Sequence, residues 1–88
     1  MAKQVIKFYA NWCGPCKVYA PAFEKVKQEL QSENIQFVEI NVENDPEKLA
    51  KQYKVKGIPC TLLVQEGVDP KSRSGRMSEV ELKQFILN

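Results

Sequence analysis

The sequence predicts a small α/β domain in which one β-sheet is covered by helices. Short segments rich in β-branched and aromatic residues alternate along the chain with segments whose apolar residues recur every three or four positions. The first two strand-like segments are separated by a helix-like one, which fits a right-handed parallel unit. The 88 residues suffice for one domain with a single hydrophobic core, so residues 1–88 are expected to form one domain.

The first half of the chain is expected to contain a strand, a helix and a second strand. Residues 4–9 (QVIKFY) are rich in β-forming residues and predict a strand. From Pro15 onward the apolar residues recur at helical spacing with lysines and glutamates between them, which predicts an amphipathic helix. Residues 35–42 (IQFVEINV) predict the second strand. The apolar positions of the helix are Ala22, Phe23, Val26 and Leu30.

A short second helix and a third strand follow. Asp45 is suited to cap a helix, and Pro46 is suited to its first position. The buried side of this helix is expected to consist of Leu49, Ala50 and Tyr53. Residues 60–65 (CTLLVQ) predict the third strand.

The last part of the chain predicts an edge strand and a final helix. Residues 71–74 are expected to return as a short edge strand after a turn. Ser78 and Glu81 have the spacing of a capping box, which marks a helix start. The predicted order is therefore β-α-β-α-β-β-α. The apolar face of the last helix is expected to comprise Val80, Leu82, Phe85 and Ile86.

Charge and hydropathy argue against nucleic-acid and membrane binding. Thirteen basic and eleven acidic residues leave a net charge of +2, and the lysines are scattered among glutamates as on a solvated surface. The N-terminal segment MAKQVIKFYA has no apolar run of signal-peptide length, and no segment approaches the roughly 20 residues of a membrane span. We therefore expect a cytoplasmic protein.

The three cysteines, Cys13, Cys16 and Cys60, indicate redox chemistry better than metal binding or a structural disulfide. A reducing cytosol keeps thiols reduced, and a structural zinc site needs four ligands, whereas this chain has no histidine. A disulfide between Cys13 and Cys16 closes too short a loop to restrict much chain entropy. If the helix starts near Gly14, Cys13 lies at its N-terminus, where free N–H groups and the helix dipole favour the thiolate that attacks disulfides. Cys16, one turn further in, is expected to be more buried and to act second.

At these residues the chain resembles the thioredoxin family. Residues 12–17 (WCGPCK) are that family's active-site motif, placed between a strand and a helix. The match continues through residues 20–21, 41–46 and 55–59, and through Gly67 and Gly75, so that it covers nearly the whole chain. The resemblance implies a minimal thioredoxin-like fold with a central mixed four-stranded sheet flanked by helices.

The resemblance also implies an activity, the reduction of protein disulfides. Cys13 would attack a client disulfide, and Cys16 would then attack Cys13 to release the reduced client. Gly14 and Pro15 between the cysteines are the family's version associated with reduction. No cofactor would be bound beyond the redox-active disulfide itself. A thioredoxin reductase would supply electrons from NADPH, and disulfide-containing clients, ribonucleotide reductase among them, would be the other partners of a monomeric protein.

A substrate groove around Cys13 carries over from the family as well. Pro59 matches the family's cis-proline, and its bond would place the backbone of Ile58 beside the dithiol. Trp12, Ile58, Pro59 and Gly75 would form the apolar rim, together with the turn formed by Gly14 and Pro15.

The chain departs from the family in two respects. The strand and helix that usually precede the active-site strand are not expected here, so the strand of residues 35–42 should lie at a sheet edge and one face should be less covered. Lys7 occupies the position of the family's buried aspartate, and Glu39 that of its partner lysine. One hypothesis is that Lys7 and Glu39 face each other behind Cys16 as further catalytic residues, with Glu39 or a water transferring the proton. The alternative is an exposed pair worth little, with the Lys7 ammonium in water.

Two other positions allow two interpretations each. Cys60 is either a third redox thiol or a small buried hydrophobe that points away from the dithiol, and burial statistics favour the second. Arg76 either selects acidic partners or is simply solvated.

Two alternatives to the reductase are a thioredoxin-fold binding module that docks a partner enzyme without turnover and a glutaredoxin-like electron donor to ribonucleotide reductase. Both cysteines in an intact motif favour the enzyme, because docking alone does not require Cys16.

Overall fold

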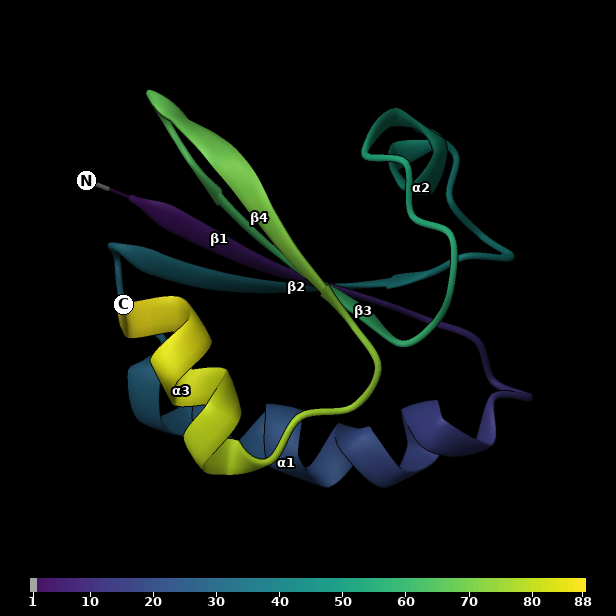
Figure 1. Cartoon of the computed structure of the whole chain (residues 1–88), viewed down its shortest axis with the longest axis horizontal. Coiled ribbons are helices and arrows are strands. Elements are labelled where there is room, and N and C mark those ends of the chain that lie inside the picture. The colour runs from purple at the N-terminus through teal and green to yellow at the C-terminus, as the bar shows by residue number, and fades with distance from the viewer. Residues whose placement is uncertain (1) are drawn as a thin grey trace.

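The computed structural model describes residues 2–88, and this part of the chain has the predicted order of elements (Figure 1). The order β-α-β-α-β-β-α is confirmed. The elements are β1 (Lys3–Tyr9), α1 (Gly14–Leu30), β2 (Ile35–Asn41), α2 (Leu49–Gln52), β3 (Cys60–Gln65), β4 (Val68–Ser74) and α3 (Glu79–Leu87).

The strands form one mixed four-stranded sheet in the order β2-β1-β3-β4. β1 pairs in parallel with β2 through the crossover helix α1, as the strand-helix-strand pattern predicts. β3 is antiparallel to both β1 and β4. The prediction that the strand of residues 35–42 lies at a sheet edge is confirmed, since β2 pairs only with β1 among the described residues. This register sets Lys7 directly opposite Glu39.

The two faces of the sheet are covered unequally. α1 and α3 lie side by side on one face, whereas α2 lies on the other side near the end of the sheet where α1 begins (Figure 1). On the first face Phe23 and Leu82 pack against Val5 and Leu63. On the second face, within residues 2–88, the strand side chains pack against the short α2 and its flanking loops. This agrees with the expectation that one face is less covered.

The second helix begins later than predicted, at Leu49, so the prediction that Pro46 opens it is wrong. The carboxylate of Asp45 does cap the helix, accepting from the N–H groups of Leu49 (3.0 Å) and Ala50 (2.9 Å). Asp45 precedes these two donors by four and five residues, so its side chain reaches them across the turn that comes before the helix. Lys48 lies in the left-handed region (φ 55°), which prevents the helix from extending back to Pro46.

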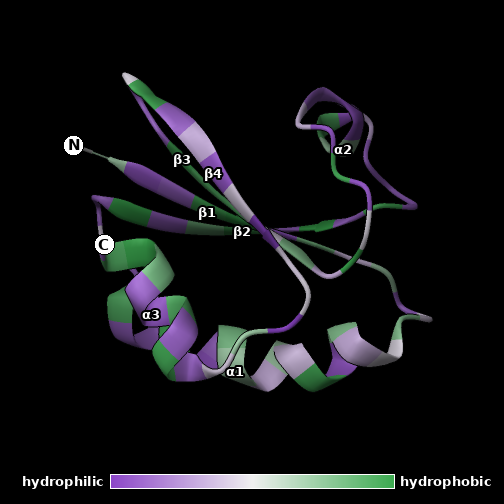
Figure 2. Cartoon of the chain, in the orientation of Figure 1, coloured by the Kyte–Doolittle hydropathy of each residue, from purple (hydrophilic) through white to green (hydrophobic). Residues whose placement is uncertain are grey.

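β4 is longer than predicted, beginning at Val68 where residues 71–74 were expected. All seven of its residues are exposed, and they are mostly hydrophilic (Figure 2). The strand is therefore defined by its backbone pairing with β3. Because both of its faces are exposed, its sequence does not alternate between apolar and polar residues.

The predicted capping box of α3 is confirmed, because Ser78 and Glu81 exchange hydrogen bonds between side chain and backbone. Leu82 and Ile86 are buried as predicted, whereas Val80 is 65% exposed and does not belong to the apolar face. Residues four apart share one side of a helix, and Val80 precedes Leu82 by only two positions, so it points away from the core.

Candidate active site

The two cysteines of the motif lie where β1 passes into α1. Cys13 is the N-cap residue of α1 with extended backbone (φ −85°, ψ 111°), and its sulfur accepts the backbone N–H of Cys16 at 3.2 Å. The two cysteines are joined as a disulfide with a Cα–Cα distance of 5.2 Å. The sequence places them there because Gly14 and Pro15 suit the first turn of a helix, where Pro loses no hydrogen bond.

This position favours a thiolate on Cys13 once the disulfide is reduced. The sulfur faces the free N–H groups of the first helical turn and the positive end of the helix dipole. Both conditions stabilise a negative charge on sulfur and so promote nucleophilic attack. Cys13 and Cys16 are 5% and 3% exposed. Cys16 is therefore the more deeply buried, as expected, but the difference in exposed fraction is small. The clearer difference between the two cysteines is that Cys13 is the N-cap residue of α1.

The residues expected to form the groove come from three segments, of which the Ile58 backbone lies near the Cys13 sulfur. Trp12 is 67% exposed beside it. The Ile58–Pro59 bond is cis, as predicted, and the carbonyl oxygen of Ile58 lies 3.9 Å from the Cys13 sulfur. Gly75 donates its backbone N–H to the Pro59 carbonyl at 2.7 Å and has a φ of 90°, which an L side chain rarely adopts. The ring of Pro59 is buried, so this part of the rim presents mainly backbone from Ile58 and Gly75.

Lys7 and Glu39 form the ion pair that one sequence hypothesis expects. The Lys7 Nζ lies 3.1 Å from Glu39 Oε1, with side-chain exposures of 4% and 37%. The alternative, in which both side chains are at the surface, is wrong for Lys7. Its ammonium lies over two aromatic rings, 4.8 Å from the centroid of Phe23 and 5.2 Å from that of Tyr9.

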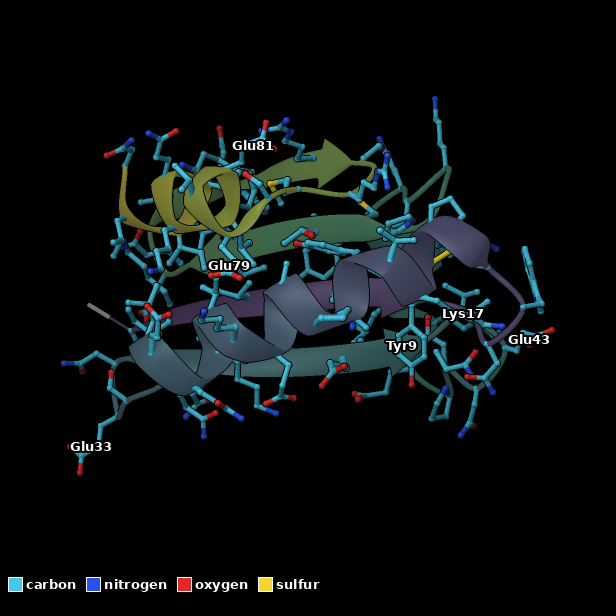
Figure 3. The ribbon with its side chains drawn as sticks, turned by 90° about the horizontal axis from the view of Figure 1, so that it is seen from below. Tyr9, Lys17, Glu33, Glu43, Glu79 and Glu81 are labelled. Atoms are coloured by element: carbon cyan, nitrogen blue, oxygen red, sulfur yellow. A yellow bond between two sulfur atoms is a disulfide. The ribbon has the colours of Figure 1, made fainter. Side chains whose placement is uncertain are left out.

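This ion pair and Cys16 share a pocket of about 230 Å³. Lys7, Glu39 and Cys16 all contribute to its lining, together with Tyr9 and Lys17. Figure 3 shows Tyr9 and Lys17 at the same end of the sheet, beside the start of α1. The structure thus brings the predicted residues of β1 and β2 into one pocket with Cys16.

Cys60 lies apart from the dithiol. It is 3% exposed and packs with Ile6, Phe8 and Leu62, whereas Cys13 and Cys16 belong to a different cluster. Burial raises the pKa of its thiol, which disfavours the reactive thiolate. The interpretation of Cys60 as a small buried hydrophobe is therefore favoured.

A second lysine that contacts Glu39 was not predicted from the sequence. Lys27 of α1 reaches Glu39 Oε2 at 3.8 Å, so the carboxylate lies between two ammonium groups. A signal for this was present, because Cys16, Ala20, Phe23 and Lys27 follow one another at steps of four, three and four, the spacing of one helix face.

Residues 2–88 contain neither a metal-binding cluster nor a membrane-spanning helix. No cluster of three or more His, Cys, Asp or Glu side chains in this range is arranged to hold a metal ion. No helix in the same range combines the length and apolar character needed to cross a membrane.

Comparison with known proteins assigns the chain to a family. The Thioredoxin family model matches residues 1–88. A thioredoxin of Mycoplasmoides gallisepticum is 37% identical over 84 residues, which cover 96% of this chain and 81% of the relative. A thioredoxin of Buchnera aphidicola is 34% identical over 82 residues, covering 93% and 73%. The crystal structure of Fasciola hepatica thioredoxin superposes with a TM-score of 0.82 at 29% identity, covering 97% of this chain and 78% of that one.

The fold and the capped Cys13–Cys16 pair agree with these comparisons. The mixed four-stranded sheet flanked by helices is shared with the solved thioredoxin. Full-length agreement with the family model, together with the paired cysteines at a helix N-terminus, identifies a thiol–disulfide oxidoreductase that belongs to the thioredoxin family.

Proposed function

We propose that this oxidoreductase works as a reductase of protein disulfides, with Cys13 as the nucleophile and Cys16 as the resolving thiol. The observation that carries the proposal is the position of Cys13 as the N-cap of α1, with its sulfur accepting the Cys16 N–H at 3.2 Å. The same hydrogen bond and helix dipole would stabilise the Cys13 thiolate in the reduced protein.

Reduction of a client proceeds in two exchange steps. The Cys13 thiolate attacks one sulfur of the client disulfide, forming a mixed disulfide and releasing the first client thiolate. Cys16 then loses its proton and attacks the Cys13 sulfur, which forms the Cys13–Cys16 disulfide and releases the second client thiolate. The cysteine pair gives two electrons, and the two client thiolates take up protons.

The groove explains how a client disulfide would be oriented. The backbone of Ile58 lies beside Cys13, since its carbonyl oxygen is 3.9 Å from the sulfur. An extended client segment can pair with this backbone by β-augmentation, which needs no particular client sequence. The exposed ring of Trp12 would supply apolar contact, and Gly75, which lacks a side chain, leaves room for the client.

The catalytic cycle requires a source of electrons and a compartment that provides it. We infer that a thioredoxin reductase returns the disulfide to the dithiol with electrons from NADPH, and that the protein acts as a monomer in the cytoplasm. Family resemblance supports this route. Ribonucleotide reductase is one client that such a donor would serve.

An NADPH-coupled insulin assay tests the proposal. Wild-type protein with a thioredoxin reductase should reduce insulin disulfides catalytically, whereas Cys16→Ser should form only the mixed disulfide and stop. If wild type bound client proteins but reduced no insulin, the binding-module alternative would replace the reductase.

A further inference from the structure

We propose that the Lys7–Glu39 ion pair activates Cys16 for the second exchange step, with the Lys7 ammonium favouring the Cys16 thiolate and Glu39 receiving the thiol proton. Lys7 acts here as a positioning residue. The inference rests on the proposed reductase function, since it concerns the step in which Cys16 resolves a mixed disulfide.

The ammonium of Lys7 is held in place inside the molecule. Its side chain is only 4% exposed, and a buried charge is costly unless it is paired. Glu39 supplies the pairing anion at 3.1 Å, and the rings of Phe23 and Tyr9 flank the ammonium at 4.8 and 5.2 Å. These contacts therefore hold the Lys7 ammonium at a fixed position.

That charge shares a pocket with the thiol that must ionise. Lys7, Glu39 and Cys16 line the same pocket of about 230 Å³, which has room for several water molecules. A positive charge acts more strongly on a developing thiolate in such a confined space than in bulk water, and it favours the ionised thiol. Cys16 thus lines the same pocket as an ammonium from β1.

The other charges around the pocket have the same overall effect. Lys17 of α1 also lines it, and Lys27 of α1 reaches Glu39 Oε2 at 3.8 Å from the solvent side. Tyr9 of β1 is the remaining titratable group in the lining. Among the described residues, the pocket lining and the ion pairs of Glu39 together include three lysines and one carboxylate. This balance favours an anion on Cys16.

Glu39 connects the pocket with solvent. Its side chain is 37% exposed, so a carboxyl group protonated inside the pocket can release its proton to bulk water. In the complete step, the proton of Cys16 passes to Glu39, directly or through water, and the sulfur of Cys16 attacks that of Cys13. The Cys13–client bond breaks, the Cys13–Cys16 bond forms, and the departing client thiolate is protonated by water.

The test separates the two exchange steps with 5,5′-dithiobis(2-nitrobenzoate) as the disulfide. Reduced protein should release one thionitrobenzoate when Cys13 attacks and a second when Cys16 resolves the adduct. In Lys7→Met we expect the second phase to slow about tenfold near neutral pH and its pH midpoint to rise by about one unit. The first phase should be unchanged. Glu39→Gln should also slow the second phase alone.

Controls distinguish this inference from general damage and from failure of the proposed function. As a control, Lys25→Met removes a lysine of α1 that pairs with Glu79 and does not line the pocket, and it should leave both phases as in wild type. Circular dichroism checks that each variant is folded, and Lys7→Gln replaces Lys7→Met if the latter does not fold.

Each result of this test contradicts a different claim. Second-phase pH profiles that coincide in wild type and the Lys7 variant would overturn the activating role of Lys7, and an unchanged second phase in Glu39→Gln would overturn its role as proton acceptor. Absence of both phases in wild type would instead refute the proposed reductase function.

Discussion

Removing one member of the Lys7–Glu39 pair should destabilise the protein unequally, depending on which charge is left behind. Glu39→Gln leaves an ammonium with only 4% exposure and no anion, whereas Lys7→Met leaves a carboxylate that is 37% exposed. The remaining Glu39 can be hydrated and keeps Lys27 at 3.8 Å, while methionine fits the apolar contacts of the Lys7 stem. Glu39→Gln is therefore the more damaging change.

The structure sets the magnitudes. Breaking a fully buried pair costs about 3–5 kcal/mol, and the partial exposure of Glu39 and the amide oxygen of glutamine reduce this to about 2 kcal/mol. For a domain of this size that lowers the melting temperature by roughly 8–16 °C. We expect Lys7→Met to cost less than about 1 kcal/mol, because an apolar side chain can replace a buried charge at little cost.

Urea unfolding of the oxidised proteins measures both changes, with Lys27→Met as a control that should cost less than about 1 kcal/mol. If Lys7→Met proved as destabilising as Glu39→Gln, Lys7 would be stabilising the fold by packing, and the argument from an uncompensated charge would be refuted.

Three further predictions concern other residues. Burial raises the pKa of Tyr19 to about 12 from 10.0, so the folded state keeps a proton that the unfolded chain loses. Stability should accordingly fall as the pH rises from 10 to 12, by up to about 3 kcal/mol, and in Tyr19→Phe urea unfolding should show a smaller fall. Gly75→Ala should cost about 1–2 kcal/mol by urea unfolding because its φ is 90°, and an unchanged midpoint would contradict that backbone assignment. In the oxidised native protein, iodoacetamide should alkylate Cys60 at least about 100-fold more slowly than in urea, and rapid native labelling would restore a redox role for this thiol.

The parts of the fold that local patterns determine could be predicted from the sequence. The buried residues of α1 recur at the period of a helix, the run of β-branched and aromatic residues predicts β1 although both of its faces are buried, and the Ser78–Glu81 capping box fixes the start of α3. The WCGPCK motif and the cis-proline likewise identify the dithiol and its groove. The strand, the helix and the cap depend on residues close together in sequence, whereas the groove was expected from the family resemblance.

The predictions that were wrong or incomplete depend on contacts between residues distant in sequence or on the local backbone conformation. β4 has no apolar alternation, because both faces of this edge strand are exposed, and only pairing with β3 defines it. The left-handed Lys48 delays α2 beyond the proline that suits a helix start. The burial of Lys7 could be raised only as a hypothesis, since the sequence does not show that Phe23 and Tyr9 enclose its ammonium.

The most direct test of the account is the identity of the cysteine that carries the client. Reduced Cys16→Ser and reduced Cys13→Ser are each incubated with a disulfide-linked peptide. Intact-mass measurement and peptide mapping then show which cysteine carries the peptide. We predict a stable mixed disulfide on Cys13 in Cys16→Ser and little or no adduct in Cys13→Ser. A stable adduct on Cys16 in Cys13→Ser, formed as fast as that on Cys13, would contradict the assignment of Cys13 as the attacking thiol.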